Sequence, residues 1–156
     1  MIKIFNLLKK SGAFYYGVAS PLLLLLVAVV NSVSVEASEV KMITHTPPSN
    51  RVLLKTQIKA IYLGQQTQWP DGSKITVFIL SSNEPTHQQF ITEILELYPY
   101  QFRRRWQKLS YSGFGVKPTV VNNKEEMLLK IANVPGAIGY IDKNVTRKGV
   151  QYVQID

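Results

Sequence analysis

Hydrophobic side chains recur at helical spacing in several segments of the chain after residue 50. Apolar residues three and four positions apart share one face of a helix and can pack on a core. The sets are Leu54, Ile58, Ile61 and Tyr62; Phe90, Ile91, Ile94, Leu95, Leu97 and Tyr98; and Met127, Leu128, Ile131 and Ala132. Pro99 is expected to end the second helix, and Phe102, Trp106 and Leu109 continue the pattern in a further one.

Short apolar runs predict strands between these helices. They cover residues 40–44, 75–80, 119–121, 137–141 and 150–155. Gly64 stands where the first helix needs a C-terminal glycine, and Asn123 with Glu126 resembles a capping box. The alternation of strands and helices predicts an α/β domain with a mostly parallel sheet.

The N-terminal segment has the pattern of a secretory signal peptide. Lysines occur within the first ten residues, an uninterrupted apolar run covers residues 22–30, and Val35 and Ala37 are the small residues that precede a cleavage site. We therefore expect a signal peptide at 1–37, export to the periplasm, and a single domain at 38–156.

The alternative for this segment is an uncleaved membrane anchor. A spanning helix needs about 20 apolar residues, and here Gly17, Ser20 and Pro21 interrupt the uncharged stretch. The cleaved signal is the favoured interpretation, and a membrane contact is expected only if the signal is retained.

Composition narrows the classes of function. The chain contains no cysteine, which excludes disulfides, thiolate nucleophiles and iron–sulfur clusters. Its net charge of +8 permits acidic partners. No basic motif interleaved with aromatic residues accompanies that charge, so a nucleic-acid partner is not expected.

Four fragments, in order, resemble the substrate-binding proteins of phosphate ABC transporters. They are IYLG at 61–64, QWPDG at 68–72, Trp106 followed by SGFG at 112–115, and PGAIGYI at 135–141. The resemblance implies a periplasmic binding protein-like (PBP-like) domain of the type II superfamily, in a short, single-lobe form. The implied fold is a three-layer α/β lobe with a mostly parallel central sheet, and the implied partners are phosphate or another oxyanion and an ABC permease.

The best candidates for ligand contact follow the strand at 75–80. Ser81, Ser82, Asn83 and Thr86 lie at a strand-to-helix junction, where hydroxyls and backbone N–H groups can hold an anion. The alternative is that they only cap the helix. The stretch lacks the arginine and the glycine of the family's phosphate-binding motif, and Glu84 adds a negative charge to it.

For the other notable polar and aromatic residues, structural or surface roles are favoured over ligand binding. The consecutive arginines 103–105 point to different sides of a helix and are expected to be solvated. His45 and His87 are predicted to have unrelated surface or loop roles, with no metal site. Trp69, Trp106 and Phe114 form either an aromatic cleft or, as we favour, core anchors for loops.

No set of residues with catalytic spacing is evident, so neither an enzyme nor a cofactor is expected. The favoured function is a substrate-binding-protein-like module. The alternative is an interaction module of the cell envelope that has lost its small ligand. A monomer is expected to bind phosphate weakly or not at all, because a second copy or another protein would have to supply the facing wall.

Overall fold

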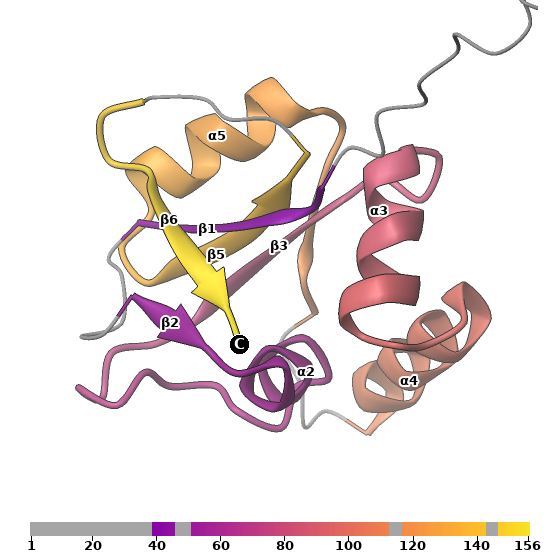
Figure 1. The fold of residues 1–156 in the computed structure, drawn as a ribbon. Coiled ribbons are helices and arrows are strands. Elements are labelled where there is room, and N and C mark those ends of the chain that lie inside the picture. Colours follow the sequence, from indigo (N-terminus) through magenta and orange to yellow (C-terminus); the bar gives the residue numbers. More distant parts are fainter. Residues whose placement is uncertain (1–38, 46–50, 113–116, 143–146) are drawn as a thin grey trace, which may run out of the picture. The chain divides into compact units, whose positions relative to one another are not determined.

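The computed structural model describes residues 39–45, 51–112, 117–142 and 147–156 (Figure 1). All of them belong to one compact unit that runs from Ser38 to Asp156. The strands are β1 (Lys41–Thr44), β2 (Val52–Leu53), β3 (Thr76–Leu80), β4 (Thr119–Val121), β5 (Ala137–Ile141) and β6 (Gln151–Ile155). The helices are α2 (Lys55–Tyr62), α3 (Pro85–Gln89), its π-helical continuation η2 (Phe90–Ile94), α4 (Pro99–Tyr111) and α5 (Lys124–Asn133).

The strands form one six-stranded sheet in the order β2-β6-β1-β5-β3-β4. β2 with β6, β5 with β3 and β3 with β4 are parallel pairs, whereas β1 is antiparallel to both of its neighbours. All strands except β1 therefore share one direction. The predicted α/β class with a mostly parallel sheet is confirmed.

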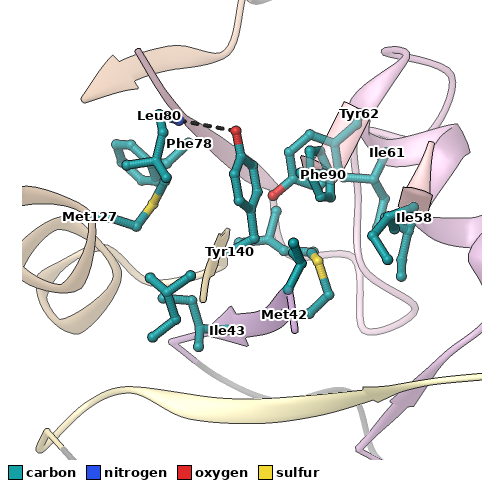
Figure 2. Packing of buried hydrophobic residues seen from close by; sticks show 14 of the residues in the cluster. Met42, Ile43, Ile58, Ile61, Tyr62, Phe78, Leu80, Phe90, Met127 and Tyr140 are labelled. Carbon is teal, nitrogen blue, oxygen red and sulfur yellow. Dashed lines mark hydrogen bonds between the residues drawn. The ribbon is translucent and has the colours of Figure 1, made fainter. Parts of the chain in front are cut away.

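Helices cover both faces of this sheet, and strand β5 is buried along its whole length. On one face Gly139 leaves room for Met127 and Ile131 of α5, whose atoms would meet any added Cβ. On the other face the ring of Tyr140 stacks on Phe90 with centroids 3.9 Å apart, and Tyr62 of α2 lies next to both (Figure 2). Since side chains alternate between the two faces of a strand, neighbouring residues of β5 contact two different helical layers.

Two helix ends follow the chemistry that the sequence predicts. Gly64 follows the C-cap Leu63 of α2 and has a φ of 71°, in the left-handed region that favours glycine. At α5 the side-chain oxygen of Asn123 accepts a hydrogen bond from the backbone N–H of Glu126 at 2.9 Å. The carboxylate of Glu126 accepts from the N–H of Asn122 at 2.8 Å, one residue before the N-cap.

The prediction that Pro99 ends the second helix is wrong. The helix stops after η2, and Glu96 takes a φ of 52°, which helical backbone does not allow. Pro99 instead begins α4, where its missing N–H would be unpaired in any case. Strand β2 is an addition to the predicted elements, because two residues are too short to form a pattern.

The proposed signal peptide at 1–37 and most of the 112–115 fragment lie outside the described residues. Within the part of the chain that the structure describes, no helix is long and apolar enough to cross a membrane.

Candidate functional site

A groove of about 470 Å³ opens over strands β3 and β4. Ile79 and Val120 line it from the sheet, His87 from α3, and Phe102, Arg103 and Trp106 from α4. We refer to this cavity as the β3–β4 groove.

The groove exists because β4 is the last strand of the sheet and is incompletely covered. Ile79 of β3 is paired with Val120 of β4, so their side chains share one face. Val120 is 58% exposed, which is unusual for a central position of a strand. Helix α4 covers only part of this face. Its buried side chains Phe102 and Trp106 form the wall of the groove and leave Val120 exposed.

Two of the predicted ligand residues, Ser81 and Ser82, line the groove. Their backbone is held in place: the N–H of Ser81 donates to Val121 O at 2.9 Å, and Ser82 O accepts from Gln88 Nε2 at 2.8 Å. Neither hydroxyl hydrogen-bonds to another described residue. The fold thus holds the backbone that carries both hydroxyls, and no described residue competes with a ligand for them.

The other two predicted ligand residues do not line the groove. Asn83 is exposed in the turn before α3. Thr86 is buried, and its hydroxyl donates to Asp142 Oδ2 at 3.1 Å. Lys124 Nζ donates to the same oxygen at 2.5 Å. Burial raises the pKa of Asp142, but the hydrogen bonds from Lys124 and Thr86 outweigh it, and the net result is a pKa below the usual value.

The capping alternative for these residues is wrong. The N-cap of α3 is Glu84, and its side chain makes no capping hydrogen bond. Pro85 follows at the first helical position, which removes one N–H that a cap would otherwise satisfy. Glu84 is also not part of the groove lining.

Positive charge reaches the groove from two segments distant from the serines. Arg103 of α4 and Lys117, which precedes β4, both line it, and no described residue of the lining is acidic. Neither cation forms an ion pair within the described ranges. Arg105 points elsewhere, since it donates to the carbonyl of Leu63 at 3.4 Å, and Arg104 is not part of the lining. This agrees with the prediction that arginines 103–105 do not form one patch.

His87 is buried, which corrects its predicted surface or loop role. Its Nδ1 lies 2.6 Å from the hydroxyl oxygen of Tyr140, which also accepts the N–H of Leu80 at 3.1 Å. The Tyr140 hydroxyl and Nδ1 of His87 are therefore hydrogen-bond partners in the buried interior. Burial lowers the pKa of His87, so the neutral ring is favoured.

The described tryptophans anchor loops, as expected. Trp69 Nε1 donates to Gly136 O at 3.1 Å, and Trp106 Nε1 donates to Tyr62 O at 3.0 Å. Trp106 also lines the groove, so the cleft interpretation holds for this one residue. Phe114 lies outside the described residues.

Metal-ligating side chains do not gather in the described part of the chain: it contains no group of three His, Asp or Glu that could hold an ion. The two histidines serve different places, because His45 Nδ1 is paired with Ile131 O at 3.0 Å.

Sequence reasoning missed the contributions of Arg103 and Lys117 to the groove. The pairing of Ile79 with Val120 is the relationship that brings Lys117 close to β3. The sequence predicted a strand at 119–121, next to Lys117, but it did not indicate that this strand pairs with β3.

Comparison with solved structures identifies the fold. The chain is similar to an ABC-type phosphate transport receptor from Vibrio cholerae, with 20% identity and a TM-score of 0.57 over 74% of this chain and 45% of that one. It is also similar to a putative phosphate ABC transporter substrate-binding protein with bound phosphate from Clostridium perfringens, with 22% identity and a TM-score of 0.59 over 74% of this chain and 44% of that one. PstS from Borrelia burgdorferi is 16% identical, with a TM-score of 0.54 over 75% of this chain and 47% of that one.

These likenesses show that the chain has the fold of part of a type II periplasmic binding protein. The structural resemblance inferred from the sequence fragments is confirmed at that level. The chain spans less than half the length of the solved structures it matches. Comparison with protein-family models gives no match, and neither does comparison with curated protein sequences.

Proposed function

We propose that residues 38–156 form a substrate-binding-protein-like module that binds an oxyanion in the β3–β4 groove. One observation carries the proposal: the hydroxyls of Ser81 and Ser82 line the same groove as the guanidinium of Arg103, and none of these groups is hydrogen-bonded or ion-paired within the part of the chain that the structure describes. Guanidinium groups and hydroxyls are the donors that proteins use for oxyanions. Two of the structural neighbours, a phosphate transport receptor and a substrate-binding protein with bound phosphate, support the same chemistry.

The arrangement favours weak binding. Arg103 replaces the positive charge that the loop at 81–86 lacks, but it is exposed, and water screens its attraction for an anion. A charge-assisted hydrogen bond with a few neutral ones, less the cost of ordering, corresponds to a Kd of roughly 0.1–1 mM. Tighter binding by a two-walled site would require a second copy or another envelope protein to face the groove.

Export belongs to the same proposal. The basic start, the apolar run at 22–30 and the small residues Val35 and Ala37 support a signal peptide that is removed before Ser38. The periplasm is then the working compartment, and an ABC permease is the proposed partner. Mass spectrometry of the periplasmic fraction should find a chain that begins at Ser38; a membrane-bound chain that keeps Met1 would overturn this part.

We infer no catalytic activity. Ser81 and Ser82 have no base hydrogen-bonded to them within the described chain, and the Nδ1 of His87 is already engaged by Tyr140. A serine nucleophile needs such a base within hydrogen-bond reach.

The test is isothermal titration of the purified protein with phosphate and with sulfate. Arg103→Gln should weaken binding about tenfold, whereas Arg104→Gln, its exposed neighbour outside the groove lining, should leave the Kd unchanged. If neither oxyanion binds and the protein instead associates with an envelope protein, the interaction-module alternative replaces the proposal. Light scattering in the same buffer gives the oligomeric state to which the Kd applies.

A further inference from the structure

The β3–β4 groove is larger than an inorganic oxyanion requires. Its volume of about 470 Å³ falls in the range, roughly 300–1,000 Å³, in which proteins bind small organic molecules. Most of its surface is apolar, because Ile79, Val120, Phe102, Trp106 and the ring of Pro118 contribute to it. A bound inorganic oxyanion would not cover this apolar surface, which would stay in contact with water.

The polar groups of the groove stand at separate places along the strands. The parallel pairs Phe78 with Thr119 and Leu80 with Val121 set the register of β3 against β4. Extended by two residues, this register puts Lys117 level with Thr76. Ser81 then lies five residues farther along β3, about 16 Å away at the usual strand rise.

Side chains of helix α4 stand near both ends of the groove. Its Phe102 ring packs against His87, at the end where the serines lie, with centroids 6.1 Å apart. Trp106, one turn later, shares a second small cavity with Lys117, at the other end. Arg103 lies between these two aromatic residues in sequence, on a helix whose turns rise about 5.4 Å.

We propose that the ligand is an organic anion, with an oxyanion head group on an apolar body, rather than a free inorganic ion. The inference rests on the proposed oxyanion function of the same groove. The head group contacts the hydroxyls of Ser81 and Ser82 and the guanidinium of Arg103. The apolar body lies over Ile79 and Val120 and extends toward Trp106, where it removes from water the surface that an inorganic ion would leave exposed.

The experiment compares inorganic phosphate, phenyl phosphate and phenol by isothermal titration against the full chain. Phenyl phosphate should bind at least tenfold more tightly than inorganic phosphate, because its ring buries apolar surface on the groove floor. Phenol, which has the ring without the head group, should bind at least tenfold more weakly than phenyl phosphate.

Val120→Thr tests the floor without a change of side-chain shape. The exposed position tolerates threonine, which is also a good strand former. The variant should weaken phenyl phosphate about threefold, a larger change than its effect on inorganic phosphate. Leu129→Thr, a similar replacement of an exposed apolar residue on α5 outside the groove, should change neither.

The outcomes separate the two proposals. Equal affinities for inorganic and phenyl phosphate overturn the organic-anion inference and leave the oxyanion function standing. Absence of binding by both phosphates overturns the oxyanion function and this inference with it. Phenol binding as tightly as phenyl phosphate, or a stable dimer that shields the groove from all three probes, overturns the head-group role of Ser81, Ser82 and Arg103.

Discussion

The hydroxyl of Tyr140, on strand β5, contacts both helix α3 and strand β3. On α3, the Nδ1 of His87 lies 2.6 Å from the tyrosine oxygen. The same oxygen accepts the backbone N–H of Leu80 at 3.1 Å (Figure 2). Strands β3 and β5 are paired only at Thr76 and Val77, so Leu80 lies beyond the end of that ladder. A side chain of β5 thus supplies the acceptor that the neighbouring strand no longer provides, and it holds α3 at the same time.

Tyr140→Phe should lower the free energy of unfolding by about 1–3 kcal/mol, since a buried N–H and a buried ring nitrogen would both lose their partner. Tyr62→Phe is the matched control. Tyr62 is equally buried, but its hydroxyl has no hydrogen-bond partner in the described structure. Removal of that hydroxyl should leave stability unchanged or raise it.

Urea unfolding of both variants, followed by circular dichroism, measures the two changes. Equal destabilisation by the two replacements would show that the Tyr140 hydroxyl acts through packing alone. A loss confined to Tyr140→Phe would establish the hydrogen bonds as its cause.

Stability should fall on acidification in a window set by His87. Burial lowers its pKa below the ordinary value of 6.5. The unfolded chain then binds a proton near pH 6.5 that the folded chain does not, so the stabilisation is complete above that pH and decreases as the pH falls below it. The carboxyls of Asp142 and Glu96, whose pKa values are lowered, act in a separate window below about pH 4.

Urea midpoints at pH 7.5 and pH 5.5 test this expectation. His87→Gln should reduce the difference between the two midpoints, because glutamine does not titrate. His45→Gln, which replaces the other histidine, should preserve the difference. If the difference between the midpoints survives in His87→Gln and disappears in His45→Gln, the pH dependence comes from His45 and the prediction is wrong.

Local patterns predicted what depends on local chemistry. The helical faces, the glycine after α2 and the Asn123 cap follow from the spacing of a few neighbouring residues. Strand direction and partner do not, because an apolar run reports burial and not its neighbour. For that reason the sequence revealed neither the reversal of β1 nor the pairing that brings Lys117 to the groove.

The candidate site divides in the same way. The position of Ser81 and Ser82 between a strand and a helix was predictable, since a strand-to-helix junction is recognisable from sequence. The buried role of His87 was not, because its partner Tyr140 lies 53 residues away. The 81–86 segment has nothing in its sequence to indicate that Thr86 contacts Asp142 instead of the groove.

Gly136→Ala should destabilise the protein by about 2–5 kcal/mol. Gly136 has a φ of 72°, and an added Cβ would lie 2.2 Å from the oxygen of Lys74, which is a backbone atom and not the end of a flexible side chain. Gly72→Ala is the control, because Gly72 has a φ of 85° but no atom within 4 Å of the Cβ position. It isolates the backbone strain, about 1–2 kcal/mol.

Unfolding followed by tryptophan fluorescence suits this pair, since Trp69 Nε1 donates to Gly136 O. Equal losses for both alanine variants would contradict the contact with Lys74. If Gly136→Ala does not fold, a larger loss than in Gly72→Ala is already established.

Thr86 and Ser82, both predicted ligand residues, should separate stability from binding. The buried hydroxyl of Thr86 donates to Asp142, so Thr86→Val should cost about 1 kcal/mol of stability and leave the Kd for phosphate unchanged. Ser82 is exposed and its hydroxyl is unpaired in the described chain, so Ser82→Ala should change stability by less than about 0.5 kcal/mol and weaken binding several-fold. Thermal unfolding and isothermal titration on the same preparations measure both quantities. A loss of phosphate affinity in Thr86→Val without a loss of stability would return Thr86 to the ligand site and exclude its structural role.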